Sequence, residues 1–169
     1  MSEYIDIYDI SRKSTGLVLP RKTKLKKDQF MLYVLALIED RDGRFLITRR
    51  AMDKKWAPGS WEIPGGGVRA GETPLQAVCR EVLEETGLNV TACPPEVIYS
   101  YRNEDAESGD NYFADIYRCR LDFSLCDVKV QEEEVIGVMT ASLEEIRKIN
   151  GESGFLHYAR ILEALENAG

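Results

Sequence analysis

The residues with the clearest chemical potential are three glutamates, Glu81, Glu84 and Glu85, which follow Arg80 in the run REVLEETGL. On a helix, residues three and four positions apart have Cβ atoms about 5–6 Å apart, so these carboxylates would share one flank. Their repulsion would cost a few tenths of a kcal/mol in open solvent, and roughly 3 kcal/mol per pair in a partly buried cleft with a dielectric near 20. A bound cation would turn this unfavourable interaction free energy into a favourable one. Carboxylates without histidine or cysteine partners suit hard cations such as Mg²⁺, with Mn²⁺ as a substitute.

The glutamates fall within a stretch that carries the signals of a complete helix. Thr73 and Gln76 have the spacing of a capping box, and Pro74 occupies the first helical position, where its missing N–H does no harm. Gly87 is the expected C-terminal cap. We therefore predict a helix from Pro74 to Thr86. Its other face is an apolar stripe that can pack on a core, formed by Leu75, Val78, Cys79, Val82 and Thr86.

The spacing around this helix forms a longer signature. Gly66 is followed after five residues by Glu72 and after seven more by Arg80. The arrangement resembles the Nudix box, and every fixed position of that box is filled. A G-x-G-x-x-A pattern at residues 65–70 overlaps it and is typical of dinucleotide-binding proteins. That motif needs a helix that starts among the glycines, and because the capping signals start the helix later, we reject it.

The resemblance covers roughly residues 28 to 150 and implies an α/β fold, a Nudix-type α/β/α sandwich with a mixed central β-sheet. We assign residues 29–169 to this single domain and residues 1–28 to an N-terminal extension, a strand and a basic loop, that packs on it. The implied activity is hydrolysis of the phosphoanhydride of a nucleoside diphosphate linked to another group, as in a nucleoside triphosphate, a nucleotide sugar or ADP-ribose. Mg²⁺ or Mn²⁺ would polarise the diphosphate and activate the attacking water.

The resemblance also implies residue roles within the signature. Glu81, Glu84 and Glu85 are the metal ligands, and the last two also count as catalytic. Arg80 would orient a glutamate through a charged hydrogen bond rather than touch the substrate. Glu72 is a further catalytic position.

Two other parts of the implied site depend on less specific features. Gly66 and Gly67 would let the backbone turn tightly beside the substrate. The general base stays open between Glu134, just before a strand expected at Val135, and its neighbour Glu133. A solvated acidic loop end explains this acidic cluster equally well.

Substrate contacts are expected from arginines and aromatic residues. Arg50 and Arg44, at opposite ends of a predicted strand, could hold phosphates, although a surface cation is an equally good account of each. Four aromatic residues could stack on a base, while a core or rim position is the commoner fate of such residues: Trp56, Trp61, Tyr101 and Tyr112. We assign no role to His157.

Composition limits the remaining classes of function. A chain of 169 residues fits one domain, and its net charge of −7 argues against a nucleic-acid groove or an anionic membrane as partner. No apolar run approaches the length of a membrane span, and no signal-peptide pattern opens the chain. The four cysteines have no CxxC spacing and are expected to be reduced thiols, so we expect a cytoplasmic protein. A single histidine excludes a His-rich zinc or iron site from this chain alone. The oligomeric state stays open, with a homodimer as one possibility.

Further elements are expected on either side of the signature. Strands at Phe30–Ile38 and Arg44–Arg50 should form a hairpin. A capping box that begins at Ser142 should start a helix that ends at Asn150-Gly151. The other expected elements are strands at Tyr4–Tyr8, Trp61–Ile63, Asn89–Cys93, Glu96–Arg102, Tyr112–Leu121 and Val135–Met139, and an amphipathic helix that carries Phe155, Tyr158, Leu162 and Leu165.

Two rival functions are weighed against hydrolysis. An isopentenyl diphosphate isomerase-like protein is suggested by the opening YIDIYD segment, but that class needs a cysteine before the box and several histidine ligands, which are missing here. A non-catalytic nucleotide sensor of the same fold would need no activated water. Because Glu72, Glu81, Glu84 and Glu85 are all present, the sequence favours the enzyme.

Overall fold

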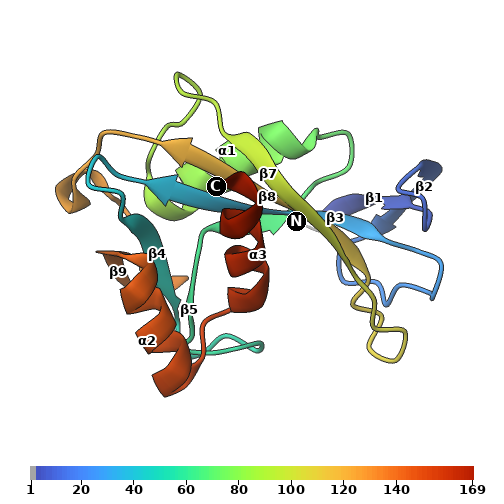
Figure 1. Cartoon of the computed structure of the whole chain (residues 1–169). Helices are drawn as coiled ribbons and strands as arrows, with labels where there is room; N and C mark the ends of the chain where they lie inside the picture. Colours follow the sequence, from blue (N-terminus) through green and yellow to red (C-terminus); the bar gives the residue numbers. More distant parts are fainter. Residues whose placement is uncertain (1–2) are drawn as a thin grey trace.

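A computed structural model describes residues 3–169 and shows a mixed β-sheet with helices on both faces (Figure 1). The elements in chain order are β1 Tyr4–Tyr8, β2 Ser14–Pro20, β3 Met31–Glu39, β4 Phe45–Arg50, β5 Trp61–Glu62, β6 Gly65–Gly67, α1 Pro74–Thr86, β7 Glu96–Asn103, β8 Tyr112–Arg120, the 3₁₀ turn η1 Leu125–Asp127, β9 Val135–Ala141, α2 Leu143–Ser153 and α3 Tyr158–Ala168. The central sheet has the order β5-β4-β3-β8-β7, with β6 paired to β3 and β9 paired to β4. β3 and β8 run parallel, and the other pairs in this sheet are antiparallel.

The central strand β3 explains why both faces of the sheet are covered. Its even-numbered residues, among them Val34 and Ala36, are buried in a cluster with Val78 and Val82 of α1. Its odd-numbered residues, such as Leu35 and Leu37, are buried in a second cluster with residues of α2 and α3: Ile146, Ile161 and Ala164. Because side chains alternate along a strand, a strand that is apolar at successive positions needs cover on both sides. The predicted α/β/α sandwich is confirmed.

The N-terminal extension forms a small unit against the end of this sandwich. β1 pairs with β2 in a separate antiparallel sheet, at the right of Figure 1, and Ile5, Ile7 and Leu25 form its own apolar cluster. The predicted strand Tyr4–Tyr8 is confirmed. The extension is joined to the main domain where the Tyr8 and Phe30 backbones exchange hydrogen bonds of 2.8 and 3.0 Å. The exact division at residues 28 and 29 stays a prediction.

Several predicted boundaries were wrong for identifiable reasons. Asn89–Cys93 is not a strand, because the Asn89 side chain accepts from the Thr91 N–H at 2.9 Å and starts a turn. The helix α2 passes Gly151 and ends at Ser153, because Gly154 (φ 81°) supplies the cap and its N–H reaches the Asn150 carbonyl. The hairpin of β3 and β4 is confirmed only at its turn, with the single registered pair Glu39–Phe45.

Two strands, β2 and β6, were not predicted at all. No helix in residues 3–169 is long and apolar enough to cross a membrane.

Candidate active site

The helix α1 has the predicted ends, Pro74 and Thr86. Thr73 and Gln76 form the reciprocal capping box, and Gly87 closes the helix in the left-handed conformation at φ 72°. The apolar stripe was predicted only in part. Leu75 is 42% exposed, and Glu81 takes a place on the buried face beside Ala77, Val78, Val82 and Thr86. The buried face of α1 therefore includes Glu81, and it excludes Leu75, which was expected there.

Glu81 is buried because the neighbouring strand is made of glycine. The residue is 8% exposed and its side chain lies against Gly66, where an added Cβ would come within 2.3 Å of Glu81 Oε1. Gly66 and Gly67 do not form the tight turn that was predicted: they belong to strand β6 and have no positive φ. Their role here is close approach, since any side chain at Gly66 would occupy the space of the carboxylate.

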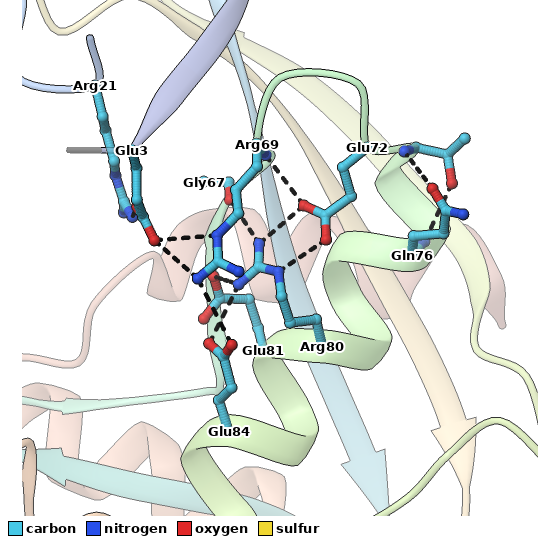
Figure 2. Close-up of polar contacts among 10 residues, drawn as sticks. Glu3, Arg21, Gly67, Arg69, Glu72, Gln76, Arg80, Glu81 and Glu84 are labelled. Atoms are coloured by element: carbon cyan, nitrogen blue, oxygen red, sulfur yellow. Dashed lines mark hydrogen bonds and ion pairs between the residues drawn. The ribbon is translucent and has the colours of Figure 1, made fainter. Parts of the chain in front are cut away.

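Arg80 holds this arrangement together (Figure 2). Its Nε donates to Glu72 Oε1 at 2.8 Å and its Nη2 to Glu72 Oε2 at 2.9 Å, while Nη1 donates to Glu81 Oε1 at 2.6 Å. Nη2 also donates to the Gly67 carbonyl at 3.1 Å. These contacts raise the pKa of Arg80, above all through the bond to Glu72. Partial burial raises the pKa of Glu72, but the bonds from Arg80 and from the Arg69 N–H outweigh it and leave a lowered value. The geometry is the one expected of an arginine that orients glutamates.

Glu85 lies beside a carboxylate that the sequence analysis missed, Glu62. Glu85 accepts the Gly65 N–H at 3.1 Å, and burial raises its pKa well above the ordinary value, helped by the charges of Glu81 and Glu62. Burial also raises the pKa of Glu62 and of Glu81, against the opposing effects of Arg50 and Arg80. The available signal for Glu62 was an acidic residue within an otherwise apolar strand directly before Pro-Gly-Gly.

The third predicted ligand, Glu84, is more open. Its side chain is 41% exposed and pairs with Arg80 at 3.3 Å and with Arg69 at 3.6 Å. Within residues 3–169, no three acidic, histidine or cysteine side chains already converge as a ready-made cation site. The chemistry of the donors nevertheless fits a hard divalent cation. Glu81, Glu85 and Glu62 offer only oxygen atoms, and they carry the like-charge repulsion that such a cation would relieve.

The other predicted residues divide between near and far positions. Arg50 pairs with Glu62 at 3.2 Å, and its guanidinium lies 5.3 Å from the centroid of the Trp56 ring. Glu134 lies beside the end of β4, because its carbonyl accepts the N–H of Ala51, the residue after that strand, at 3.0 Å. Its carboxylate pairs with Lys54. Because Ala51 directly follows Arg50, which pairs with Glu62, Glu134 lies at the edge of the site.

Within residues 3–169, no contact brings Arg44 or Glu133 to the site. Arg44 precedes the far end of β4 and binds the Thr140 carbonyl at 2.9 Å and Glu145 at 2.7 Å. A strand of this length separates it from Arg50 by about 20 Å, so we assign it no phosphate. Glu133 lies exposed in the turn before β9.

The aromatic residues are divided in the same way. Trp56 and Tyr112 line a cavity next to the carboxylates, together with His157, to which the sequence analysis gave no role. Trp61 packs against the apolar cluster beneath α2 and α3. Tyr101 also packs on that cluster, and its hydroxyl lies 3.2 Å from His157 Nδ1.

Comparison with known proteins identifies the family of this chain. The chain matches the NUDIX domain family over residues 29–160, a span that includes β3 to the first turn of α3. The chain belongs to the Nudix family. It is 32% identical over 136 residues to a MutT-like protein of Streptomyces ambofaciens, covering 80% of this chain and 77% of that one. It is 29% identical over 154 residues to an uncharacterized Nudix hydrolase of Listeria monocytogenes, covering 90% and 88% of the two chains.

A solved structure supports the fold of this Nudix protein. The crystal structure of a Deinococcus radiodurans protein aligns with a TM-score of 0.75 at 20% identity, covering 95% of this chain and 96% of that one. Because that alignment includes most of the N-terminal extension, the extension is part of the shared fold. As a Nudix hydrolase, the protein is an enzyme that acts on acid anhydrides of phosphorus-containing compounds.

Proposed function

We propose that the protein is a Mg²⁺-dependent pyrophosphohydrolase that cleaves the phosphoanhydride of a nucleoside diphosphate linked to another group. The observation that carries the proposal is a pair of carboxylates, the buried Glu81 and the partly buried Glu85, fixed against the glycine strand β6. Glu81 is held by Arg80, and Glu85 by the Gly65 N–H. Buried like charges of this kind are unfavourable unless a cation joins them.

The residues divide the work as follows. Glu81, Glu84 and Glu85 would hold the metal, which supplies polarisation of the diphosphate and a water of lowered pKa. Arg80 and Glu72 position Glu81 without reaching the substrate. Arg50 fixes Glu62 at the edge of the site. The general base is a carboxylate within reach of the water, and Glu134 stays our candidate because it lies at the edge of the site beside Lys54.

Substitution of Glu85 tests the proposal. Glu85→Gln keeps the shape of the side chain and its bond to the Gly65 N–H but removes a ligand charge, so we expect hydrolysis to fall by at least about 10³-fold with unchanged far-UV circular dichroism. Glu166→Gln, at an exposed position of α3, makes the same chemical change away from the site and should keep full activity. Hydrolysis is measured as Mg²⁺-dependent incorporation of ¹⁸O from labelled water into a phosphate product, over a panel of nucleoside diphosphate derivatives. Wild-type activity in Glu85→Gln would remove the assignment.

A nucleotide sensor of the same fold would give a different result. It would show ligand-induced melting shifts without ¹⁸O incorporation. Arg80 joins Glu72, Glu81 and Glu84 in one network, and Glu85 is fixed beside it by the Gly65 N–H, so all four carboxylates are in place for turnover. The cytoplasmic location and the homodimer stay predictions from the sequence.

A further inference from the structure

A cavity of about 690 Å³ lies where the strands β3 and β8 begin. Tyr33 of β3 and Tyr112 of β8 line it, together with Trp56 and His157. Residues 21–24, which follow β2 in the N-terminal extension, and the loop before β8 line it as well. Its volume is that of a small-molecule site.

This cavity adjoins the carboxylates of the candidate active site. The ring of Trp56 in the cavity wall has its centroid 5.3 Å from the Arg50 guanidinium, which pairs with Glu62 at 3.2 Å, so the cavity lies one residue away from this carboxylate. Arg21 belongs to both regions. Its Cζ lies 3.4 Å from the position of a Cβ on Gly67, whose carbonyl accepts a hydrogen bond from Arg80. Figure 2 shows Arg21 beside Glu3, which binds both Arg21 and Arg69. A substrate whose diphosphate lies at Glu81 and Glu85 would therefore extend into the cavity.

The wall supplied by the extension is basic, although the chain as a whole carries a net charge of −7. It contributes Arg21, Lys22 and Lys24. Arg21 is paired with Glu3, whereas the lysine ion pairs within residues 3–169 are formed by Lys54 and Lys148. Lys22 and Lys24 thus have no carboxylate partner in the described part of the chain.

Lys24 is held in its place on this wall. Its Cγ would lie 2.7 Å from a Cβ on Gly109, which has φ +77°, so only glycine there leaves room for the lysine stem. Two carboxylates, Asp105 and Asp110, line the same cavity. Asp105 is occupied by the N–H groups of Glu107 and Ser108, both at 3.1 Å. The hydrogen bonds from Ser108 lower the pKa of Asp105, and the charge of Lys24 also contributes to this shift. Neither lysine, however, forms an ion pair within 4.0 Å in the described part of the chain, so both ammonium groups can bind an anion.

We propose that the cavity holds the part of the substrate beyond the scissile diphosphate, and that Lys22 and Lys24 bind a further phosphate on that part. Two aromatic side chains that line the same cavity, Trp56 and Tyr112, would bind the nucleoside. The proposal rests on the proposed function and deepens it, because it makes the extension a determinant of substrate choice. Both lysines precede residue 29, where the match to the Nudix domain begins.

Two kinds of substrate carry such a phosphate: nucleotides with a longer phosphate chain, and nucleotides phosphorylated on a ribose. Matched pairs separate them: ATP against ADP for the first, and ADP-ribose 2′-phosphate against ADP-ribose for the second. We expect kcat/KM to favour the more phosphorylated member of one pair by about tenfold, the effect of one or two charge-assisted contacts. The preference should lie mainly in KM, since the contact is made equally in ground and transition states.

The double substitution Lys22→Ala/Lys24→Ala should bring that ratio close to one. The control Lys26→Ala/Lys27→Ala removes the same charge from the same segment at exposed positions outside the cavity and should keep the ratio. The proposal is overturned if the wild type shows no preference in either pair, or if the two double variants change the ratio alike.

A binding measurement separates this proposal from the proposed function. With Trp61→Phe, Trp56 is the only tryptophan left, and its fluorescence reports on the cavity. In the Glu85→Gln background with Mg²⁺, we expect the more phosphorylated member of the preferred pair to bind about tenfold more tightly, and Lys22→Ala/Lys24→Ala to abolish the difference. The difference in binding without any wild-type hydrolysis would refute the proposed function alone. Hydrolysis without any difference in binding or in KM would refute the phosphate site alone.

Discussion

Replacing Gly66 by alanine tests whether the glycine strand exists to make room for Glu81. An ideal Cβ on Gly66 would lie 2.3 Å from Glu81 Oε1 and 2.4 Å from Cδ, whereas non-bonded carbon contacts are comfortable at about 3.5–4.0 Å. The carboxylate would have to move by about 1 Å, and its bond of 2.6 Å to Arg80 Nη1 would stretch or break. A hydrogen bond between charged groups contributes about 1.5–3 kcal/mol. We expect the free energy of unfolding to fall by about 2 kcal/mol and Tm by about 4–8 °C.

The loss of activity in Gly66→Ala should exceed the loss of stability. A catalytic group misplaced by about 1 Å costs about 10²-fold in rate, so kcat for Mg²⁺-dependent hydrolysis should fall by that factor while the protein stays folded. Chemical denaturation and steady-state hydrolysis of the same preparation measure the two effects.

The same substitution at two other glycines provides the controls for Gly66→Ala. A Cβ on Gly65 would meet the Val34 backbone carbonyl at 2.2 Å, so Gly65→Ala should fail to fold. Gly151 lies within α2 with nothing inside 4 Å, so Gly151→Ala should stabilise the protein by up to about 1 kcal/mol. If Gly66→Ala has wild-type kcat and a free energy of unfolding within about 0.5 kcal/mol of wild type, then Glu81 does not need its observed position and the reasoning fails.

Two further substitutions test the supporting contacts. Arg80→Lys keeps the charge but cannot reach Glu72, Glu81 and the Gly67 carbonyl together, so activity should fall about 10- to 100-fold with a raised Mg²⁺ requirement in steady-state titrations; an unchanged Mg²⁺ requirement would contradict its positioning role. Arg12→Ala leaves the buried Asp115 carboxylate without its cation and should lower the free energy of unfolding in urea by about 2–3 kcal/mol, less than for a fully buried pair because Arg12 is partly exposed. The exposed pair Arg41–Asp122 is its control, and Arg41→Ala should give no measurable change; equal effects would contradict the role of burial.

The sequence was most informative where the signals are local. The limits of α1 followed from the capping box at Thr73 and from Gly87, because caps depend on residues within a few positions of each other. The same reasoning failed at the end of α2, where Gly151 and Gly154 are both possible caps and the positive φ falls on the second. Strand β6 was missed because glycine has low strand propensity, and only its pairing with β3 makes it a strand.

The parts of the site that depend on distant contacts were not predictable. Glu62 joins the carboxylates only because β5 and β6 bring it beside Glu85, more than twenty positions along the chain. Arg44 and Arg50 look alike in the sequence, yet pairing of β4 with β9 leaves Arg44 next to Thr140 and α2. His157 was given no role because its place on the cavity follows from the packing of α3, with its own backbone at φ 60°.

The contacts of Glu3 have a consequence for comparisons between relatives. This one carboxylate binds Arg21 of the extension at 2.6 Å and Arg69, in the loop at residues 67–72, at 2.8 Å. The Tyr4 carbonyl accepts the Ala70 N–H of the same loop at 2.8 Å. Exchanging residues 1–28 between two relatives would therefore also exchange a set of partners for the loop at residues 67–72. In such chimaeras the N-terminal extension and the loop at residues 67–72 have to be transplanted together. Substitutions that arise in one of them during evolution should be accompanied by substitutions in the other.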